Sequence, residues 1–510
     1  MASKTVVCLF LAFAVLLAGC SSPKSVSVQV PEPDYWPTAG WQSSTPEAQG
    51  MDSNLLAQML EEINTNETRI HSVLVIRNGY LVTEAYFQPY RRDTKVHIQS
   101  VTKSVIGALV GIAVKDGYIK SADEKMINFF PNRIYDNPSR AKDSIRLKHL
   151  LSMSSGFPCE EFSNSGQSME QTSGWIQFML DLPIDTPPGK TFGYCNGNAH
   201  LLSAIIEKTT GLNTREFANQ ELFEPLGIPP VQASDWWADP QGFPDGGFGL
   251  FLRPVDMAKL AFLYLNNGKW EDEQIISAKW IADSTTEHIQ KEDGSGYGYL
   301  WTVYSEAGHY AALGMSGQQV HVYPSKNLIV IVTAELESYA EAPEIERMLT
   351  EFILPSIKSD VPLTDNRAGI SRLQKTIGLV ANPVQLVPAL PEIAQEISGQ
   401  RYTLEDNPYG WQNMVLIFKP GANIVQVSTT GSEDFDEIGL DNIYRPSILP
   451  GNQYMMRGHW ADDQTFMVEW TQPGNTGSLE IWLKYSVDQL EITVQPVIFG
   501  GEPAVIKGSK

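Results

Sequence analysis

One apolar segment constrains the fold of this chain more than any other. It runs from Ile98 to Ile119 and has the sequence IQSVTKSVIGALVGIAVKDGYI. The nearly unbroken apolar residues behind Lys103, closed by Asp116-Gly117, predict a helix that ends at a glycine. Because a helix with so few polar positions is typical of a buried element, the rest of the chain must pack around it.

The same segment opens with the tetrad Ser100-Val101-Thr102-Lys103. Residues three apart share one face of a helix, so this spacing places the Lys103 amine beside the Ser100 hydroxyl, at the positive end of the helix dipole. A serine hydroxyl is a poor nucleophile until a base removes its proton, and a lysine can be that base if burial lowers its pKa. The same spacing also occurs at Ser21 and Ser139, each of which has a lysine three residues on. The tetrad at Ser100 is therefore informative because an apolar helix follows it.

Length and composition indicate a globular protein with more than one domain. The chain has 510 residues, too many for one ordinary core, so we expect at least two domains. Hydrophobic residues at 42% and charged residues at 19% are typical of a folded chain. The formal net charge of −22 argues against nucleic acid as a partner, since binding phosphates requires clustered Lys and Arg.

The N-terminus carries the pattern of an export signal. Lys4 precedes an apolar stretch at 6–17 that is too short to span a bilayer, and the motif LAGC follows at 17–20. Residues 1–19 are therefore predicted to be a signal peptide. Its end resembles a bacterial lipobox, which implies a lipid on Cys20 after cleavage. An ordinary secretory signal and an uncleaved membrane anchor are the alternatives.

A lipid on Cys20 would place the protein in the bacterial cell envelope. Ser21, rather than Asp, comes next, and this favours the outer membrane of a Gram-negative cell, facing the periplasm. Residues 20–45 are rich in Ser and Pro and are predicted to be a lipidated tether. Since no other segment is long and apolar enough to cross a membrane, the expected membrane contact is through the lipid anchor only.

Two cysteines remain if Cys8 leaves with the signal and Cys20 carries lipid, namely Cys159 and Cys195. In an oxidising compartment such a pair suggests a disulfide, and two separate buried thiols are the alternative. No Cys/His cluster has the spacing of a zinc site, and the eight histidines are scattered. We therefore expect no metal and no cofactor.

Local patterns predict an α+β body at 46–358 with a smaller domain behind it. Asn78-Gly79 joins two β-rich runs, which is a strong hairpin signal, and a second hairpin turns at 325–327. A mostly helical block separates the hairpins, so we expect an antiparallel sheet built from both ends of the body, flanked by helices and with a helical insertion. Residues 359–397 are predicted to be a linker with a short helix, and 398–510 an antiparallel all-β domain or barrel.

Four motifs follow one another along the body: SVTK at 100–103, LLSMSSG at 150–156, Tyr194-Cys195-Asn196, and Met315-Ser316-Gly317 before a strand. As a set in this order they resemble the serine β-lactamase and penicillin-binding-protein family, and the resemblance covers roughly residues 45–358. It looks closest to the class C-like branch, which includes esterases, D-aminopeptidases and 6-aminohexanoate-dimer hydrolases. The resemblance implies a β-lactamase-like fold and hydrolysis through an acyl-enzyme.

The resemblance also implies roles for the residues that would carry out the reaction. Ser100 would be the acylated nucleophile, and Lys103 would accept a hydrogen bond or a proton from it. Tyr194 would help to deprotonate Ser100 and to protonate the leaving group. A tyrosine is a plausible base only if a nearby ammonium, in this chain Lys103, lowers its pKa.

The other implied residues would hold the substrate. Asn196 would hydrogen-bond Lys103 or the substrate. The backbone N–H groups of Ser100 and Gln318 would form the oxyanion hole, with Ser316-Gly317 beside them. Donors aimed at a developing oxyanion are often the largest catalytic contribution, about 10²–10³ in rate for each donor.

The last motif, Met315-Ser316-Gly317, departs from the family pattern, because Met315 stands where Lys or His is usual. Met cannot hold the carboxylate that β-lactams and D-Ala-D-Ala peptides present, so we predict a serine hydrolase that cleaves a small neutral ester or amide. A penicillin-recognising peptidase or β-lactamase, and a non-catalytic binding protein of the same fold, are the alternatives. His309 could replace the missing cation or be a loop histidine. Trp236-Trp237 and Trp301 could line an acyl pocket or pack in the core.

Overall fold

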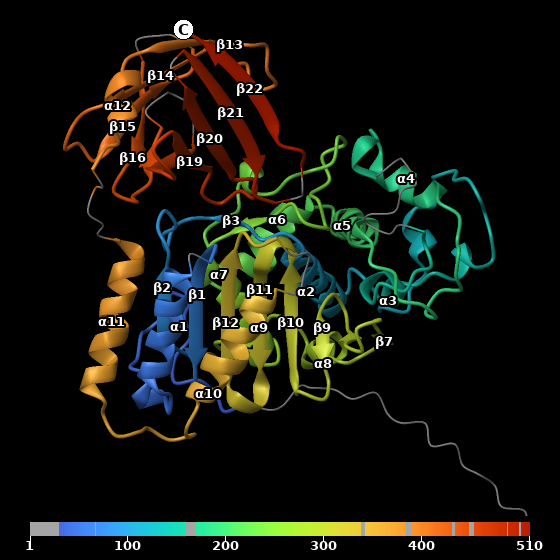
Figure 1. Ribbon diagram of the computed structural model, residues 1–510. Helices are drawn as coiled ribbons and strands as arrows, with labels where there is room; N and C mark the ends of the chain where they lie inside the picture. The colour runs from blue at the N-terminus through green and yellow to red at the C-terminus, as the bar shows by residue number, and fades with distance from the viewer. Residues whose placement is uncertain are drawn as a thin grey trace, which may run out of the picture.

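The chain folds into a mixed body of helices and strands and a separate β-barrel, which Figure 1 shows in orange and red above one end of the body. The predicted signal peptide, the lipid on Cys20 and the side chain of Cys159 lie outside the described residues. The residues described by this computed structural model are 30–66, 68–158, 169–337, 342–383, 387, 389–430, 434–447, 453–486, 488–498 and 501–510.

The body is built around an eight-stranded antiparallel sheet in the order β2-β1-β12-β11-β10-β9-β8-β7. Asn78 and Gly79 form the turn between β1 and β2 with φ values of 52° and 84°, as a tight two-residue hairpin requires. The first two strands come from the start of the body and the other six from its end, as the sequence predicted. The strands are β1 Ile70–Arg77, β2 Tyr80–Tyr86, β7 Ile289–Gln290, β8 Gly296–Tyr297, β9 Thr302–Tyr304, β10 His309–Gly314, β11 Gln318–Tyr323 and β12 Leu328–Ala334.

Helices cover both faces of this sheet. Side chains alternate between the faces along a strand. Val73 and Val75 of β1 therefore join the core under one group of helices, and Leu74 and Ile76 join the core on the other side. The helices of the first face are α1 Ser53–Thr65, α9 Pro343–Arg347, the π-helical turn η9 Met348–Ile353, α10 Leu354–Ser356 and α11 Arg367–Ala381.

The second face carries the helical insertion, and helix α2 lies between that insertion and the sheet (Figure 1). Every residue of α2 from 101 to 113 is buried, which confirms the prediction of an enclosed helix. Trp280 of α8 contributes to the enclosure because its Nε1 donates to the Gly107 carbonyl at 3.0 Å. The helices on this side are α2 Val101–Lys115, α3 Leu147–Leu151, α4 Trp175–Asp181, α5 Asn196–Thr210, α6 Thr214–Ala218, α7 Pro254–Leu265 and α8 Ala278–Ser284.

Two short strand pairs complete the body, one beside the start of α2 and one beside α7. The first pair joins β3 to β4 with His97 opposite Phe251. Their bounds are β3 Val96–His97, β4 Phe251–Leu252, β5 Lys269–Trp270 and β6 Glu273–Gln274.

The C-terminal domain is a ten-stranded sheet that closes into a β-barrel of nine strands, with β17 outside the ring, which confirms the prediction of a separate all-β domain. The strands follow the order β16-β15-β14-β13-β22-β21-β20-β19-β18-β17, and a pairing of β16 with β18 closes the ring. The linker before it holds α11, longer than the short helix predicted, and α12 Glu392–Ile397. The strands are β13 Arg401–Leu404, β14 Asn413–Phe418, β15 Ile424–Ser428, β16 Asp436–Gly439, β17 Arg445–Pro446, β18 Met455–Trp460, β19 Thr465–Thr471, β20 Leu479–Ser486, β21 Gln489–Pro496 and β22 Ala504–Ser509.

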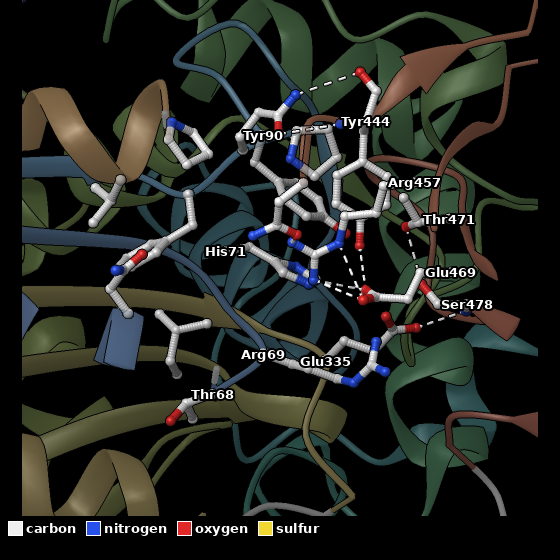
Figure 2. Close-up of a pocket in the computed structure, with 18 of the residues that line it drawn as sticks. Thr68, Arg69, His71, Tyr90, Glu335, Tyr444, Arg457, Glu469, Thr471 and Ser478 are labelled. Atoms are coloured by element: carbon white, nitrogen blue, oxygen red, sulfur yellow. Dashed lines mark hydrogen bonds and ion pairs between the residues drawn. The ribbon is translucent and has the colours of Figure 1, made fainter. Parts of the chain in front are cut away.

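The barrel meets the body through a polar junction, shown in Figure 2. Arg69, which precedes β1, pairs with Glu480 of β20 at 2.6 Å. The side chain of Gln88 exchanges two hydrogen bonds with the backbone of Tyr444, at 3.4 and 3.3 Å. A cavity of about 140 Å³ lies between the two domains at this point. The junction therefore depends on directional polar contacts that set one relative orientation.

The described part of the chain contains no helix that is long and apolar enough to cross a membrane.

The enclosure of α2 leaves no space for a side chain at Gly111, where a Cβ would lie 2.4 Å from the Trp280 ring. Gly111→Ala should therefore lower the free energy of unfolding by about 1–3 kcal/mol, measured by urea denaturation. Gly378 in α11 has open space at its Cβ position, so Gly378→Ala should instead raise stability by roughly 0.5–1 kcal/mol. A Gly111→Ala variant as stable as the Gly378→Ala variant would contradict this packing.

Candidate active site

The candidate site is built at the start of α2, where the backbone turns sharply into the helix. Ser100 occupies the N-cap position with φ −66° and ψ −5°. The preceding residue, Gln99, has φ 51°, in the left-handed region that side chains other than glycine seldom adopt. Residues held in such conformations cluster at functional sites, because the surrounding structure must maintain them.

Lys103 lies one helical turn below Ser100, as the tetrad predicted, and its side chain is 1% exposed. Its Nζ is 2.9 Å from Ser100 Oγ, 2.6 Å from Asn196 Oδ1 and 2.8 Å from the Gly247 carbonyl oxygen. A protonated amine can donate all three bonds. A neutral amine can donate two of them and accept the third from the Ser100 hydroxyl. The same geometry therefore serves both protonation states of a general base.

The Tyr194-Cys195-Asn196 motif lies against this lysine at the start of α5. Asn196 is the first residue of that helix, and the Tyr194 ring lies before it with its centroid 4.6 Å from Lys103 Nζ. An ammonium over a ring face is attracted by the ring's electrons. Cys195 between them is buried and disulfide-bonded, which sets aside the alternative of a free thiol at this position.

The third oxygen around Lys103 comes from a loop that the sequence did not assign to the site. Gly247 presents its carbonyl to Lys103, and a Cβ on Gly247 would lie 3.0 Å from the Asn196 Oδ1 atom, so the loop passes very close. Asp245 shapes this turn, because its Oδ1 accepts the Gly247 N–H at 2.7 Å. The only signal in the sequence was the glycine-rich run from 246 to 249.

Asp245 is a buried acid at the edge of the site. Its side chain is 0% exposed, and burial raises the pKa of its carboxyl, whereas the charges of His200 and Lys103 oppose that rise. Trp236 fixes the same turn, since its Nε1 donates to the Asp245 carbonyl at 2.8 Å. The loop that supplies the Gly247 acceptor is thus held by buried hydrogen bonds.

The Met315-Ser316-Gly317 motif forms the turn between β10 and β11. The turn spans Met315–Gly317, and Ser316 and Gly317 within it have φ values of 61° and 88°. This turn approaches the start of α2, because a Cβ on Gly314 would lie 2.7 Å from the Ile98 carbonyl and 3.1 Å from Gln99. The predicted Met-Ser-Gly motif therefore lies beside the nucleophile helix, at the beginning of a strand as expected.

Gln318 follows this turn as the first residue of β11 and is 2% exposed. Its side chain points to β12, where Nε2 donates to the Ala334 carbonyl at 2.5 Å. Ser316 is likewise buried, and its carbonyl accepts the Leu336 N–H at 3.1 Å. The backbone of this turn, rather than either side chain, is the part that can serve an oxyanion.

His309 does not take the place of the cation missing at Met315. It begins β10 and stacks with Tyr304 and Tyr323, with both pairs of ring centroids 4.4 Å apart. Met315 follows the other end of the same strand, so about six residues at roughly 3.3 Å each separate the two along the strand. Strand geometry therefore excludes His309 as a replacement for the cation that is missing at Met315.

The tryptophans divide between the core and the surface. Trp236 and Trp301 are 2% and 1% exposed, so packing rather than a pocket accounts for both. Trp237 is 45% exposed, and its ring lies 4.4 Å from the His97 ring. Among the described residues, no three His, Cys, Asp or Glu side chains are arranged to hold a metal ion.

Comparisons with known proteins place this geometry in a family. A family model described as Beta-lactamase matches residues 56–351, more than half of the chain, and the chain belongs to that family of serine hydrolases. The 6-aminohexanoate-dimer hydrolase of Paenarthrobacter ureafaciens is 24% identical over 301 residues, which are 54% of this chain and 74% of that protein. The family expected from the motif order is confirmed.

Two further matches are more distant. A "Putative D-alanyl-D-alanine carboxypeptidase" of Escherichia coli O157:H7 is 22% identical over 332 residues, covering 52% of this chain and 75% of that protein. The solved structure of a "Putative 6-aminohexanoate-dimer hydrolase from Bacillus anthracis" is 18% identical and has a TM-score of 0.52. It covers 68% of this chain and 92% of that one, and it supports the fold alone.

The role of Asp245 as the acceptor that orients Gly247 can be tested separately from the negative charge of its carboxylate. Asp245→Ala removes the acceptor that orients Gly247, so kcat for a p-nitrophenyl ester should fall about 10-fold or more. Asp245→Asn keeps an oxygen for the Gly247 N–H, and its kcat should fall by less than about 3-fold. Equal losses in the two variants would show that the carboxylate charge, rather than the turn, matters.

Proposed function

We propose that the protein is a serine hydrolase that cleaves a small neutral ester or amide through an acyl-enzyme on Ser100. The observation that carries the proposal is the buried Lys103 amine, 2.9 Å from Ser100 Oγ and held by Asn196 and Gly247. A lysine enclosed in this way, at hydrogen-bonding distance from a serine hydroxyl, fits the arrangement of an activated nucleophile and its base.

The proposed reaction has two halves. In the first, Ser100 Oγ attacks the substrate carbonyl carbon while its proton passes to Lys103 or, through it, to Tyr194. The tetrahedral intermediate then collapses, the bond to the leaving group breaks, and that group receives the proton. In the second half, water gives a proton to the same base and attacks the acyl carbon, which releases the acid and restores the Ser100 hydroxyl.

The oxyanion of the intermediate needs donors that are already in place. We assign this role to the backbone N–H groups of Ser100 and Gln318, as the family resemblance implies. The backbone conformation around both positions supports the assignment: Gln99 directly before Ser100 and Ser316 two residues before Gln318 are both in the left-handed region. Donors held rigidly need no rearrangement when charge develops on the substrate.

The substrate class follows from the chemistry of the Met315-Ser316-Gly317 motif. Met315 offers no cation, so a substrate carboxylate would meet no charged partner from this position. We therefore favour an ester or amide without a carboxylate next to the scissile bond. The likeness to the 6-aminohexanoate-dimer hydrolase, which by its name acts on an amide, supports the amide as one member of this class.

The assignment of the nucleophile can be tested with Ser100→Ala. This variant should lose turnover of short p-nitrophenyl esters and covalent labelling by a fluorophosphonate probe, because it lacks the hydroxyl that lies 2.9 Å from Lys103 Nζ. Ser104→Ala is the matched control, since that buried serine lies in the same helix with its Oγ donating to the Leu300 carbonyl at 2.6 Å, and it should still be labelled. Labelling that persists in Ser100→Ala would exclude the assignment, and a wild type that is never labelled would favour a binding protein.

Met315→Lys tests the substrate class. The wild type should turn over a neutral p-nitrophenyl ester and should neither hydrolyse nor retain a labelled penicillin. Met315→Lys should raise the penicillin acylation rate by roughly 10-fold or more relative to ester turnover, since a charge-assisted hydrogen bond contributes about 1.5–3 kcal/mol. Met315→Leu serves as the neutral control. Stable acylation of the wild type by penicillin would favour a penicillin-recognising peptidase.

A further inference from the structure

A loop of the C-terminal barrel reaches the candidate active site. It joins β19 to β20 at 472–478, and we refer to it as the barrel loop. The Gly474 carbonyl accepts the His97 N–H at 2.6 Å. A Cβ on Gly474 would lie 2.2 Å from the Lys95 carbonyl oxygen, so the two backbones touch. His97 is three residues before Ser100, and the contact therefore adjoins the nucleophile.

The other side of the barrel loop is fixed to the sheet. Glu335, directly after β12, is 2% exposed, and its Oε1 accepts the N–H groups of Gly477 and Ser478 at 2.9 and 2.8 Å. Figure 2 shows Glu335 directed toward Ser478 across the domain junction. The next residue, Leu336, donates its N–H to the carbonyl of Ser316. The barrel loop thus contacts the segment before Ser100 directly and is linked to the Ser316 turn through Glu335 and Leu336.

One side chain of the barrel loop contacts the strained residue before the nucleophile. Gln99 is 6% exposed, and its Nε2 donates to Thr476 Oγ1 at 3.0 Å and to His97 Nδ1 at 3.1 Å. Since His97 Nδ1 accepts here, the ring proton lies on Nε2, which contacts the Phe248 carbonyl at 2.6 Å. The Gln99 side chain is therefore held between the barrel and the body.

These contacts form a continuous chain of hydrogen bonds. It runs from Thr476 through Gln99 and His97 to the Phe248 carbonyl. At one end, Gln99 in its left-handed conformation sets the position of Ser100. At the other end, Phe248 follows Gly247, whose carbonyl holds Lys103. The chain therefore touches the backbone next to the nucleophile and next to an acceptor of its base.

We propose that Thr476 of the barrel loop is a positioning residue for Ser100 and acts through Gln99. The barrel would then contribute to the activity of the hydrolase. The inference rests on the proposed function of Ser100. A non-glycine residue in the left-handed region is strained and relaxes unless its surroundings hold it. The Thr476 hydroxyl is the contribution of the barrel to that restraint, and Thr476 itself need not contact the substrate.

The test compares Thr476→Val, which removes the hydroxyl at nearly constant volume, with Thr476→Ser, which keeps it. Thr476→Val should slow fluorophosphonate labelling of Ser100 and lower kcat for a short ester by about 3- to 10-fold, the effect of one lost hydrogen bond. KM should change by less than about 2-fold, because the substrate is not contacted. Thr476→Ser should stay within about 2-fold of the wild-type labelling rate.

Two further variants separate positioning from loss of stability. Ser398 hydrogen-bonds both the N–H and the carbonyl of Phe418 in the barrel, each at 3.0 Å. Ser398→Ala should therefore destabilise the barrel without slowing the labelling of Ser100. Gln99→Met removes the same bond from the other side. The double variant Gln99→Met/Thr476→Val should be labelled no more slowly than Gln99→Met alone.

Each outcome of these labelling experiments either supports or overturns the proposed role of Thr476. Slow labelling in Thr476→Val that Thr476→Ser restores, with no effect of Ser398→Ala, supports the proposal. Labelling of Thr476→Val at the wild-type rate, equal losses in Thr476→Val and Thr476→Ser, or fully additive losses in the double variant would each overturn it while leaving the role of Ser100 intact. If the wild type is not labelled at all, the proposed function fails and this inference fails with it.

Discussion

The structure depends on the burial of one lysine side chain. An amine taken out of water is costly unless its hydrogen bonds are satisfied, and Lys103 is 1% exposed. The three oxygens around its Nζ come from the start of α2, the start of α5 and the loop that contains Gly247. Three segments far apart in the sequence must therefore converge on one atom, and this requirement fixes the helical insertion against the sheet.

Around that lysine the backbone is held in unusual conformations. Gln99 and Ser316 both have positive φ, and each directly precedes a segment that faces the candidate reaction centre. A rigid support is needed to hold such residues, and the all-buried strands β11 and β12 together with the enclosed helix α2 provide it. The strained residues Gln99 and Ser316 therefore lie close to the backbone N–H groups that would bind an oxyanion.

The position of the β-barrel gives it a contact with the candidate active site that its sequence did not indicate. From sequence it was predicted only as a separate all-β domain. In the structure its polar junction with the body, formed by pairs such as Arg69 with Glu480, sets the barrel in one orientation. That orientation brings the barrel loop against Gln99. A domain that contributes no catalytic residue can in this way still influence the nucleophile.

The sequence by itself determined the buried helix after Ser100, the two hairpins of the sheet, the order of the motifs and the all-β character of the C-terminal domain. These follow from local periodicity, turn chemistry and motif order, which depend on neighbouring residues. The signal peptide and the lipid on Cys20 stay predictions, because they lie outside the described residues. Only the tertiary structure decided that Gly247 and Asp245 support Lys103, that His309 lies at the far end of β10, and that Thr476 reaches Gln99. The contacts of Gly247 with Lys103 and of Thr476 with Gln99 join residues 144 and 377 positions apart, and no local pattern encodes which distant segment will arrive.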